Sequence, residues 1–149
     1  MLISTLRQSA LALLAVAGLA TPALAGECPA DRAAINTLAG APTMPMGVTD
    51  TVIGSIDLGP EIALPDRQLR TRRLVIQPGG IVPLHSHVDR PALIYTLSGT
   101  ITEYRSNCAV PIVHMAGDVA REAEGISHYW INRGSDPVVL LSSDIHHDQ

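Results

Sequence analysis

The segments GGIVPLHSH (residues 79–87) and HYWIN (residues 128–132) decide the fold of this chain. His85 and His87 are two residues apart in a run typical of a β-strand, and side chains at positions i and i+2 of a strand point to the same face. His128 on a neighbouring strand can complete a set of three imidazoles. Imidazole is the commonest metal-binding side chain and suits zinc, iron, copper and nickel. The pattern therefore predicts a metal site, and two surface histidines on an exposed edge are the alternative.

The sequence around these segments predicts many short strands separated by turn residues. We expect strands at residues 51–58, 68–76, 81–87, 93–97, 100–105, 111–115, 119–121, 128–132 and 137–144. Short strands at near-regular spacing indicate a β-sandwich or barrel. Residues 26–47 are rich in Ala, Pro, Gly and Thr, with a short helix expected near residues 32–38. We therefore assign residues 26–67 to an irregular N-terminal arm and a first strand, and residues 68–149 to the barrel.

The first 25 residues have the features of a secretory signal. Arg7 precedes an uninterrupted apolar run at residues 10–20, and Ala23-Leu24-Ala25 follows. The run is too short to span a bilayer, and the small-x-small pattern typically precedes a cleavage site. We expect residues 1–25 to be a signal peptide and the mature protein to be periplasmic or secreted. A membrane anchor, or lipid attachment at Cys28, is the alternative.

The charge balance excludes one class of partner. All ten basic residues are arginines, and the chain has fourteen acidic residues. Binding to phosphate backbones needs a basic surface, so we expect no nucleic-acid partner. No charge run or basic amphipathic helix favours a membrane surface for the mature protein.

The chain contains two cysteines, Cys28 and Cys108. An even cysteine count in an exported chain indicates one disulfide, which would tie the N-terminal arm to the middle of the domain. Two thiols in a metal site are the alternative, although their spacing matches no metal-binding motif.

Eight positions at fixed spacing resemble the two motifs of the cupin superfamily. The first motif is Gly, five residues, His-x-His, three or four residues, Glu, six residues, Gly. The second is Gly, five residues, Pro-x-Gly, two residues, His, three residues, Asn. The matching positions are Gly79, His85, His87, Gly99, Gly117, Gly125, His128 and Asn132. The resemblance covers about residues 69–144 and implies an all-β fold, a double-stranded β-helix or jelly-roll barrel.

Two positions depart from the family pattern. Ala92 stands where the family has its glutamate ligand, and Ala123 stands where it has proline. The resemblance then implies a divalent ion held by His85, His87 and His128 alone; Fe, Mn, Ni, Cu and Zn all remain open. Three neutral imidazoles can hold such an ion with positions left for water or substrate. With one negative charge fewer, the ion should be a stronger Lewis acid and should bind less tightly. Family members that lack ligands can instead use the barrel as an organic-ligand pocket.

Further residues could support the metal site. The resemblance places His114 near the barrel interior, where it could be a fourth ligand or a hydrogen-bond donor to a ligand. Its alternative is a buried histidine bonded to the backbone. Glu103 could reach the same site if its strand register suits, and a solvated strand position is its alternative. We expect Glu122 and Glu124 to be surface charges.

Arg90 and two aromatic residues are the candidates for binding a substrate. Arg90 could receive a carboxylate or phosphate in bidentate fashion, and an ion pair with Asp89 or another acid is the alternative. Tyr95 and Trp130 could line the pocket, and core packing is the alternative for both.

These features predict an exported cupin that binds a divalent metal and a small anionic or oxygenated ligand. A metal-dependent oxidoreductase is the first enzymatic interpretation. A non-enzymatic module that sequesters or senses a small ligand or metal is the alternative, and a structural domain with inherited histidines is a third. A homodimer paired through sheet edges is compatible with the pattern.

Overall fold

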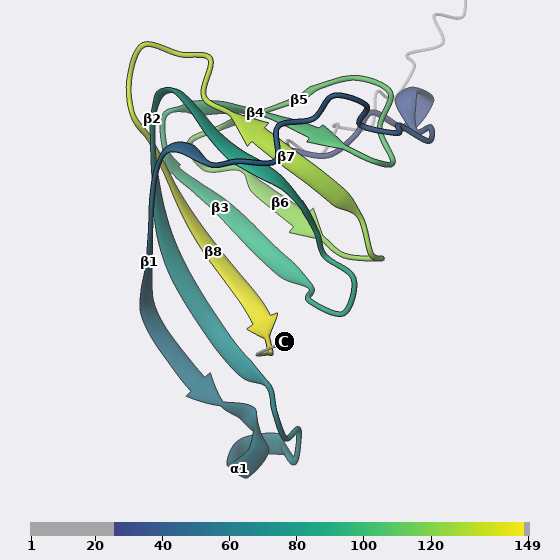
Figure 1. The fold of residues 1–149 in the computed structure, drawn as a ribbon. Helices are drawn as coiled ribbons and strands as arrows, with labels where there is room; N and C mark the ends of the chain where they lie inside the picture. The colour runs from purple at the N-terminus through teal and green to yellow at the C-terminus, as the bar shows by residue number, and fades with distance from the viewer. Residues whose placement is uncertain (1–25, 148–149) are drawn as a thin grey trace, which may run out of the picture.

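The computed structural model describes residues 26–147, so the expected signal peptide lies outside the described residues. The chain folds into a nearly closed β-barrel that is wide at one end and tapers toward the other (Figure 1). Its strands are β1 (Met46–Asp57), β2 (Gln68–Ser86), β3 (Ala92–Ser98), β4 (Thr100–Arg105), β5 (Ile112–Met115), β6 (Val119–Glu122), β7 (Ser127–Ile131) and β8 (Val138–His146). They are hydrogen-bonded in the order β5-β4-β7-β2-β8-β3-β6, and β1 pairs with β2. The all-β jelly-roll expectation is confirmed.

Strand β2 joins the two halves of the barrel. Its first half pairs with β8 and its second half pairs with β7. The separation expected between strands at residues 68–76 and 81–87 is therefore wrong, because the chain bends there without leaving the sheet. Gly79 adopts a φ of 73°, a conformation that glycine adopts without steric cost. The Gly79 N–H donates to the Asn132 carbonyl (2.9 Å), and the Asn132 N–H donates to the Gly80 carbonyl (3.0 Å).

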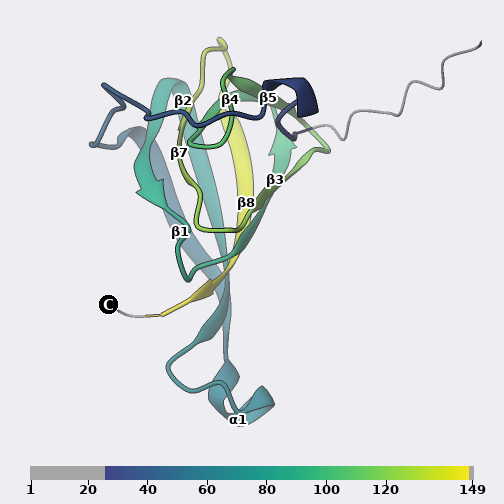
Figure 2. The ribbon, with the colours of Figure 1, turned by 90° about the vertical axis from the view of Figure 1, so that its right-hand side faces the viewer.

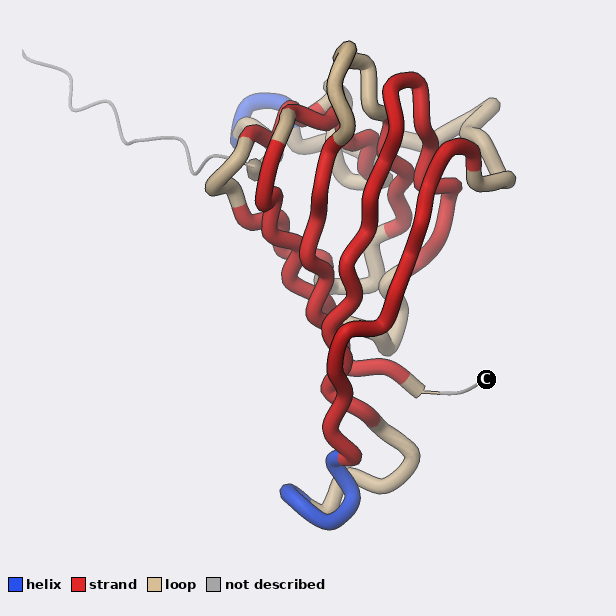
Figure 3. Tube along the Cα trace, turned by 90° about the vertical axis from the view of Figure 1, so that its left-hand side faces the viewer, coloured by secondary structure: helices blue, strands red, loops and turns tan. Residues whose placement is uncertain are grey.

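Other boundaries differ from expectation at the N-terminal side. The helix expected near residues 32–38 is only a 3-10 turn, η1 (Ala30–Arg32). The break expected at Gly59-Pro60 is a short helix, α1 (Leu58–Ile62), whose first turn is capped by the Asp57 carboxylate accepting from the Gly59 N–H at 2.9 Å. Figures 2 and 3 show that α1 closes a hairpin of β1 and β2 that projects from the narrow end of the barrel. Among the described residues, no helix is long and apolar enough to cross a membrane.

The barrel core is aliphatic apart from one tryptophan. Inward side chains alternate with outward ones along β3, β4, β6 and β8, as expected for strands with one buried face. The buried cluster consists of Leu74, Ile76, Ile94, Ile101, Ala120, Trp130, Val138 and Leu140. Along β8 the buried positions change from aliphatic Val138 and Leu140 to polar Ser142 and Asp144.

The predicted disulfide is present. Cys28 and Cys108 are bonded, with Cα atoms 5.7 Å apart and 80 residues of sequence separation. The arm also forms an isolated bridge from Ala33 to Cys108. The disulfide therefore fixes the N-terminal arm against the loop that follows β4.

Candidate metal centre

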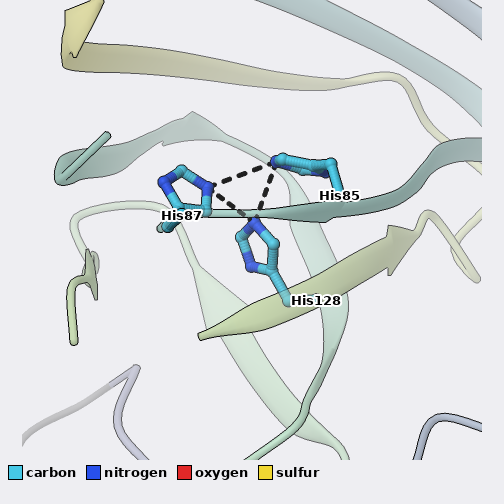
Figure 4. Close-up of side chains that lie close together, drawn as sticks. All are labelled: His85, His87 and His128. Carbon is cyan, nitrogen blue, oxygen red and sulfur yellow. Dashed lines mark hydrogen bonds between the residues drawn. The ribbon is translucent and has the colours of Figure 1, made fainter. Parts of the chain in front are cut away.

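Three imidazoles converge inside the barrel. His85 lies near the end of β2, His87 follows that strand, and His128 lies on β7, directly opposite His85 in the strand register. Their Nε2 atoms form a triangle (Figure 4): 3.2 Å from His85 to His87, 3.0 Å from His87 to His128 and 3.0 Å from His85 to His128. The two-residue spacing of the first pair places both rings on one side of the chain, as the sequence predicted.

The hydrogen bonds of the other ring nitrogens fix the protonation of all three histidines. Nδ1 of His85 lies 2.8 Å from the Pro83 carbonyl, Nδ1 of His87 lies 2.8 Å from the Arg90 carbonyl, and Nδ1 of His128 lies 2.6 Å from Glu103 Oε1. These oxygens only accept, so each neutral ring donates through Nδ1 and keeps a lone pair on Nε2. The Trp130 indole N–H also lies 3.1 Å from His128 Nδ1, but the contact with the charged Glu103 is shorter, at 2.6 Å, and it needs the hydrogen on Nδ1. Three lone pairs that face one another at this distance share no hydrogen, and a central cation would satisfy all of them.

The size of the triangle tests whether a metal ion fits. For a metal–nitrogen distance of about 2.1 Å, three ligands at right angles are about 3.0 Å apart, and three at tetrahedral angles are about 3.4 Å apart. The observed sides of 3.0–3.2 Å match right angles more closely. The three histidines therefore fit a divalent transition-metal ion with several positions left open.

Burial keeps these rings neutral. It lowers the pKa of His85 to about 3, with a further contribution from His128. Burial and the same neighbour lower the pKa of His87 to about 4. The pKa of His128 is also lowered, again by burial first, although Glu103 opposes the shift. All three rings are therefore available as metal ligands at neutral pH.

Glu103 is the central residue behind His128. Its side chain is fully buried, so the solvated position considered from the sequence is wrong. It accepts hydrogen bonds from His128, from His114 Nε2 (2.8 Å) and from Arg105 Nε (2.6 Å). Burial alone would raise the pKa of Glu103, but the two histidine hydrogen bonds and the Arg105 charge hold it well below its usual range. Glu103 is thus an ionised carboxylate that orients His128.

His114 does not join the three histidines. It is fully buried and bonds the Glu103 carboxylate rather than the backbone. Its ring lies against Trp130, with centroids 4.5 Å apart. His114 therefore supports the carboxylate that supports His128.

Ala92 lies between two buried carboxylates. On the inner face of β3, it is paired with Glu122 of β6 on one side and with Asp144 of β8 on the other. Both carboxylates are buried, and the group of facing ligand atoms formed by the three histidines contains neither of them. Asp144 is held by both nitrogens of the Arg70 fork (3.1 and 2.8 Å). Glu122 accepts a bond from Arg105 at 3.0 Å.

The expectation that Glu122 is a surface charge is wrong. Its exposed fraction is 0%, and burial, with the adjacent Glu103 charge, raises its pKa to about 9. The predicted strand ended at Arg121, one residue too early. Extending the alternation from buried Ala120 would have placed Glu122 inside. Glu124 is exposed, as expected.

A cavity of about 410 Å³ lies beside His85. One wall is apolar and includes Leu74, Ile94, Trp130 and Leu140, while the other side has Asp50, Arg72, Arg90 and Ser142. Two of the three predicted substrate-binding residues, Arg90 and Trp130, therefore line it. Tyr95 does not, because the alternation of β3 places it on the outer face, where it is 39% exposed.

The sequence interpretation missed the ionic group at the polar side of this cavity. Asp89 pairs with Arg67 at 2.5 Å, so it is not the partner of Arg90. Arg90 instead lies 3.6 Å from Asp144. Positions 70 and 72 share the inner face of β2 with Leu74 and Ile76, and this alternation was the available signal. The partnership with Asp144 depends on the register of β2 with β8 and has no local sequence signal.

Comparisons with known proteins agree with the geometry. The family model described as "Cupin domain" matches residues 72–144. Germin-like protein 8-14 of Oryza sativa subsp. japonica is 34% identical over 73 residues, which cover 46% of this chain and 34% of that protein. Germin-like protein 1 of Brassica napus is 29% identical over 76 residues, covering 49% and 37%. The chain thus spans about a third of the length of these curated relatives.

Two solved structures have the same fold. The Schizosaccharomyces pombe Cnp3 cupin domain superposes with a TM-score of 0.55 at 14% identity, over 69% of this chain and 66% of that one. A predicted oxalate decarboxylase from Thermotoga maritima superposes with a TM-score of 0.55 at 18% identity, over 75% of this chain and 97% of that one. At such identities the similarity shows the fold alone.

Proposed function

The chain belongs to the cupin superfamily, and from this premise we propose that its barrel holds a divalent transition-metal ion through His85, His87 and His128 and binds a small anionic or oxygenated molecule beside it. One observation carries the proposal. Each of the three rings donates its Nδ1 hydrogen to a fixed oxygen, so three Nε2 lone pairs face a common centre.

The chain's own residues have separable roles in this proposal. The bound ion would supply Lewis acidity toward an oxygen-bearing ligand. Glu103 holds His128 in the tautomer and orientation that expose Nε2. The Arg90 backbone carbonyl does the same for His87. The apolar wall of the cavity excludes water from one side of the ligand, and the charged side orients it.

Two functions are compatible with such a site. Open metal positions next to a ligand-sized cavity favour a metal-dependent oxidoreductase acting on the bound molecule. The absence of a carboxylate at Ala92 favours a module that binds or senses its ligand without turnover, because the ion is held less tightly. The disulfide is consistent with an oxidising compartment, and we include export to the periplasm or the exterior in the proposal.

Elemental analysis of the protein purified without a tag or chelator tests the metal site. We expect near-stoichiometric metal in the wild type, loss of that metal in His85→Ala and retention in His146→Ala, a histidine outside the three. Iron, copper, manganese or nickel would favour redox chemistry, while zinc would favour hydrolysis or a structural ion. A wild-type protein that neither contains nor takes up any of these metals would refute the proposal.

A further inference from the structure

We propose that the ligand of this cavity is a monocarboxylate with a compact apolar body, and that Arg90, assisted by Arg72, receives its carboxylate. The inference deepens the proposed function, because the cavity is the one that adjoins His85. It depends on the charges, hydrogen bonds and apolar wall of the cavity itself.

The charged side of the cavity has one positive charge in excess. Three arginines, Arg70, Arg72 and Arg90, surround Asp144, at 2.8, 3.9 and 3.6 Å respectively. Asp50 adds a second carboxylate, 2.5 Å from Arg72. Three guanidinium groups therefore share two carboxylates, and one further anion would balance the group before any metal charge is counted.

The hydrogen bonds show which arginine is free to bind that anion. Arg70 uses both nitrogens of its fork on Asp144. Arg72 donates one terminal nitrogen to Asp50 and approaches Ser142 Oγ only at 3.4 Å with the other, while its Nε is buried without a partner. Among residues 26–147, the Arg90 guanidinium has the 3.6 Å contact with Asp144 and no hydrogen bond.

The surroundings of Arg90 indicate the same deficit of negative charge. Its side chain is 22% exposed, so water satisfies its donors only in part. A planar guanidinium with unused parallel donors matches a carboxylate in bidentate geometry.

The apolar lining residues determine the rest of the ligand. Leu74, Ile94, Leu140 and Trp130 present aliphatic and aromatic surface to the same cavity. A volume of about 410 Å³ is near the lower end of the range for ligand pockets, so the apolar body must be small. In the metal-free protein, one excess charge beside apolar side chains fits a monocarboxylate better than a phosphate dianion.

Arg90 places the carboxylate of the proposed ligand near Ala92, the position where the family has its glutamate ligand. Arg90 precedes Ala92 by two residues, and its backbone carbonyl anchors His87. The same short segment thus orients a histidine of the metal site with its backbone and offers a guanidinium to the ligand with its side chain. A bound carboxylate would bring to the site the negative charge that Ala92 does not supply.

The chain contains a reporter for this cavity. Trp130 is its one tryptophan and lines the apolar wall. We would titrate the wild-type protein with cyclohexanecarboxylate, with the neutral cyclohexanecarboxamide and with inorganic phosphate, following tryptophan fluorescence and confirming the affinities by calorimetry. We expect the carboxylate to bind at least tenfold more tightly than the amide, and phosphate to bind more weakly than the carboxylate.

Variants assign the selectivity to Arg90. Arg90→Gln should lose at least tenfold in carboxylate affinity with little change for the amide, and Arg90→Lys should lose less. Arg133→Gln, which removes an exposed arginine stacked on Tyr104 outside the cavity, should behave like the wild type. Equal affinity for acid and amide in the wild type, tighter binding of phosphate, or full carboxylate affinity in a folded Arg90→Gln protein would overturn the inference.

The same samples separate this inference from the metal proposal. Metal content is measured on each protein, and the titrations are repeated after chelator treatment. Carboxylate selectivity in a protein that takes up no metal would refute the metal site and retain the ligand class. Stoichiometric metal without carboxylate selectivity would retain the metal site and refute the ligand class.

Discussion

Replacing Glu103 with glutamine should weaken metal binding by about 10- to 100-fold while the barrel stays folded. Oε1 of Glu103 lies 2.6 Å from His128 Nδ1, so the carboxylate fixes the tautomer and increases the basicity of Nε2. Substitution of such an outer partner of a metal-binding histidine typically costs 10- to 100-fold in affinity, or about 1.4–2.7 kcal/mol. Glutamine keeps the shape of the side chain and removes its charge.

Glu122 explains why this variant should remain folded. It lies beside Arg105 and has a pKa raised to about 9, in part because Glu103 is ionised next to it. When Glu103 becomes neutral, Glu122 can ionise more easily and balance the buried Arg105 charge. Glu103→Gln combined with Glu122→Gln should be much less stable, because the buried Arg105 charge would keep only its 3.3 Å pairing with Glu27, and breaking a buried ion pair typically costs about 3–5 kcal/mol.

Competition between the protein and a chelator for zinc or manganese measures the affinity. Glu124→Gln is the matched control, because Glu124 is exposed. Thermal unfolding of the metal-free proteins shows whether the fold is intact. A folded Glu103→Gln protein with wild-type metal affinity would refute the argument that this carboxylate orients His128.

Two further predictions concern stability. The metal-free protein should be most stable near pH 6.5, the ordinary pKa of histidine. Below it the unfolded chain binds protons that the folded His85 and His87, with pKa values of about 3 and 4, do not. Each histidine contributes up to about 1.4 kcal/mol per pH unit, and together they outweigh the opposing slope of similar size from Glu122. Above pH 6.5, stability should fall as the pH rises toward the pKa of Glu122, about 9, because folded Glu122 holds a proton that the unfolded chain has released. Urea unfolding of chelator-treated protein from pH 5 to pH 9 measures this dependence. A steady rise in stability toward pH 9 would contradict the prediction. Reducing the Cys28–Cys108 bond, or replacing both cysteines with serine, should lower the free energy of unfolding by up to about 4–5 kcal/mol, because the bond closes a loop of 80 residues in the unfolded chain. An unfolding free energy unchanged by reductant would argue against this.

The sequence could predict those features that depend on local alternation and fixed spacing. His85 and His87 share a face because a strand repeats every two residues. Gly79 and Asn132, which both match the family spacing, are hydrogen-bonded to each other at the bend of β2. The remaining features depend on register between distant strands. Asp144 reaches Arg70 across 74 positions of sequence, and no local pattern specifies which residue of β8 faces which residue of β2.

Small boundary errors had large consequences for the site. Ending the strand at Arg121 placed Glu122 on the surface, whereas one more residue of alternation places it inside, beside Arg105. Tyr95 illustrates the opposite error. Aromatic character suggested a pocket wall, but its phase in β3 relative to buried Ile94 directs it outward.

The replacement of the glutamate ligand by Ala92 has to be understood together with its neighbours. Of the two carboxyl groups on either side, Glu122 is protonated at neutral pH, with a pKa of about 9, and Asp144 is paired with Arg70. Neither therefore offers free charge to an ion held by three neutral histidines. An ion in that position would lack a counter-charge of its own, whereas an anion at Arg90 is balanced by the guanidinium but would still attract the ion. The two proposals together therefore require that metal and carboxylate each raise the affinity for the other, and by thermodynamic linkage the two factors must be equal. Measuring carboxylate affinity with and without metal, and metal affinity with and without carboxylate, tests whether the two factors are equal. Independent binding would show that the two sites do not share a charge balance.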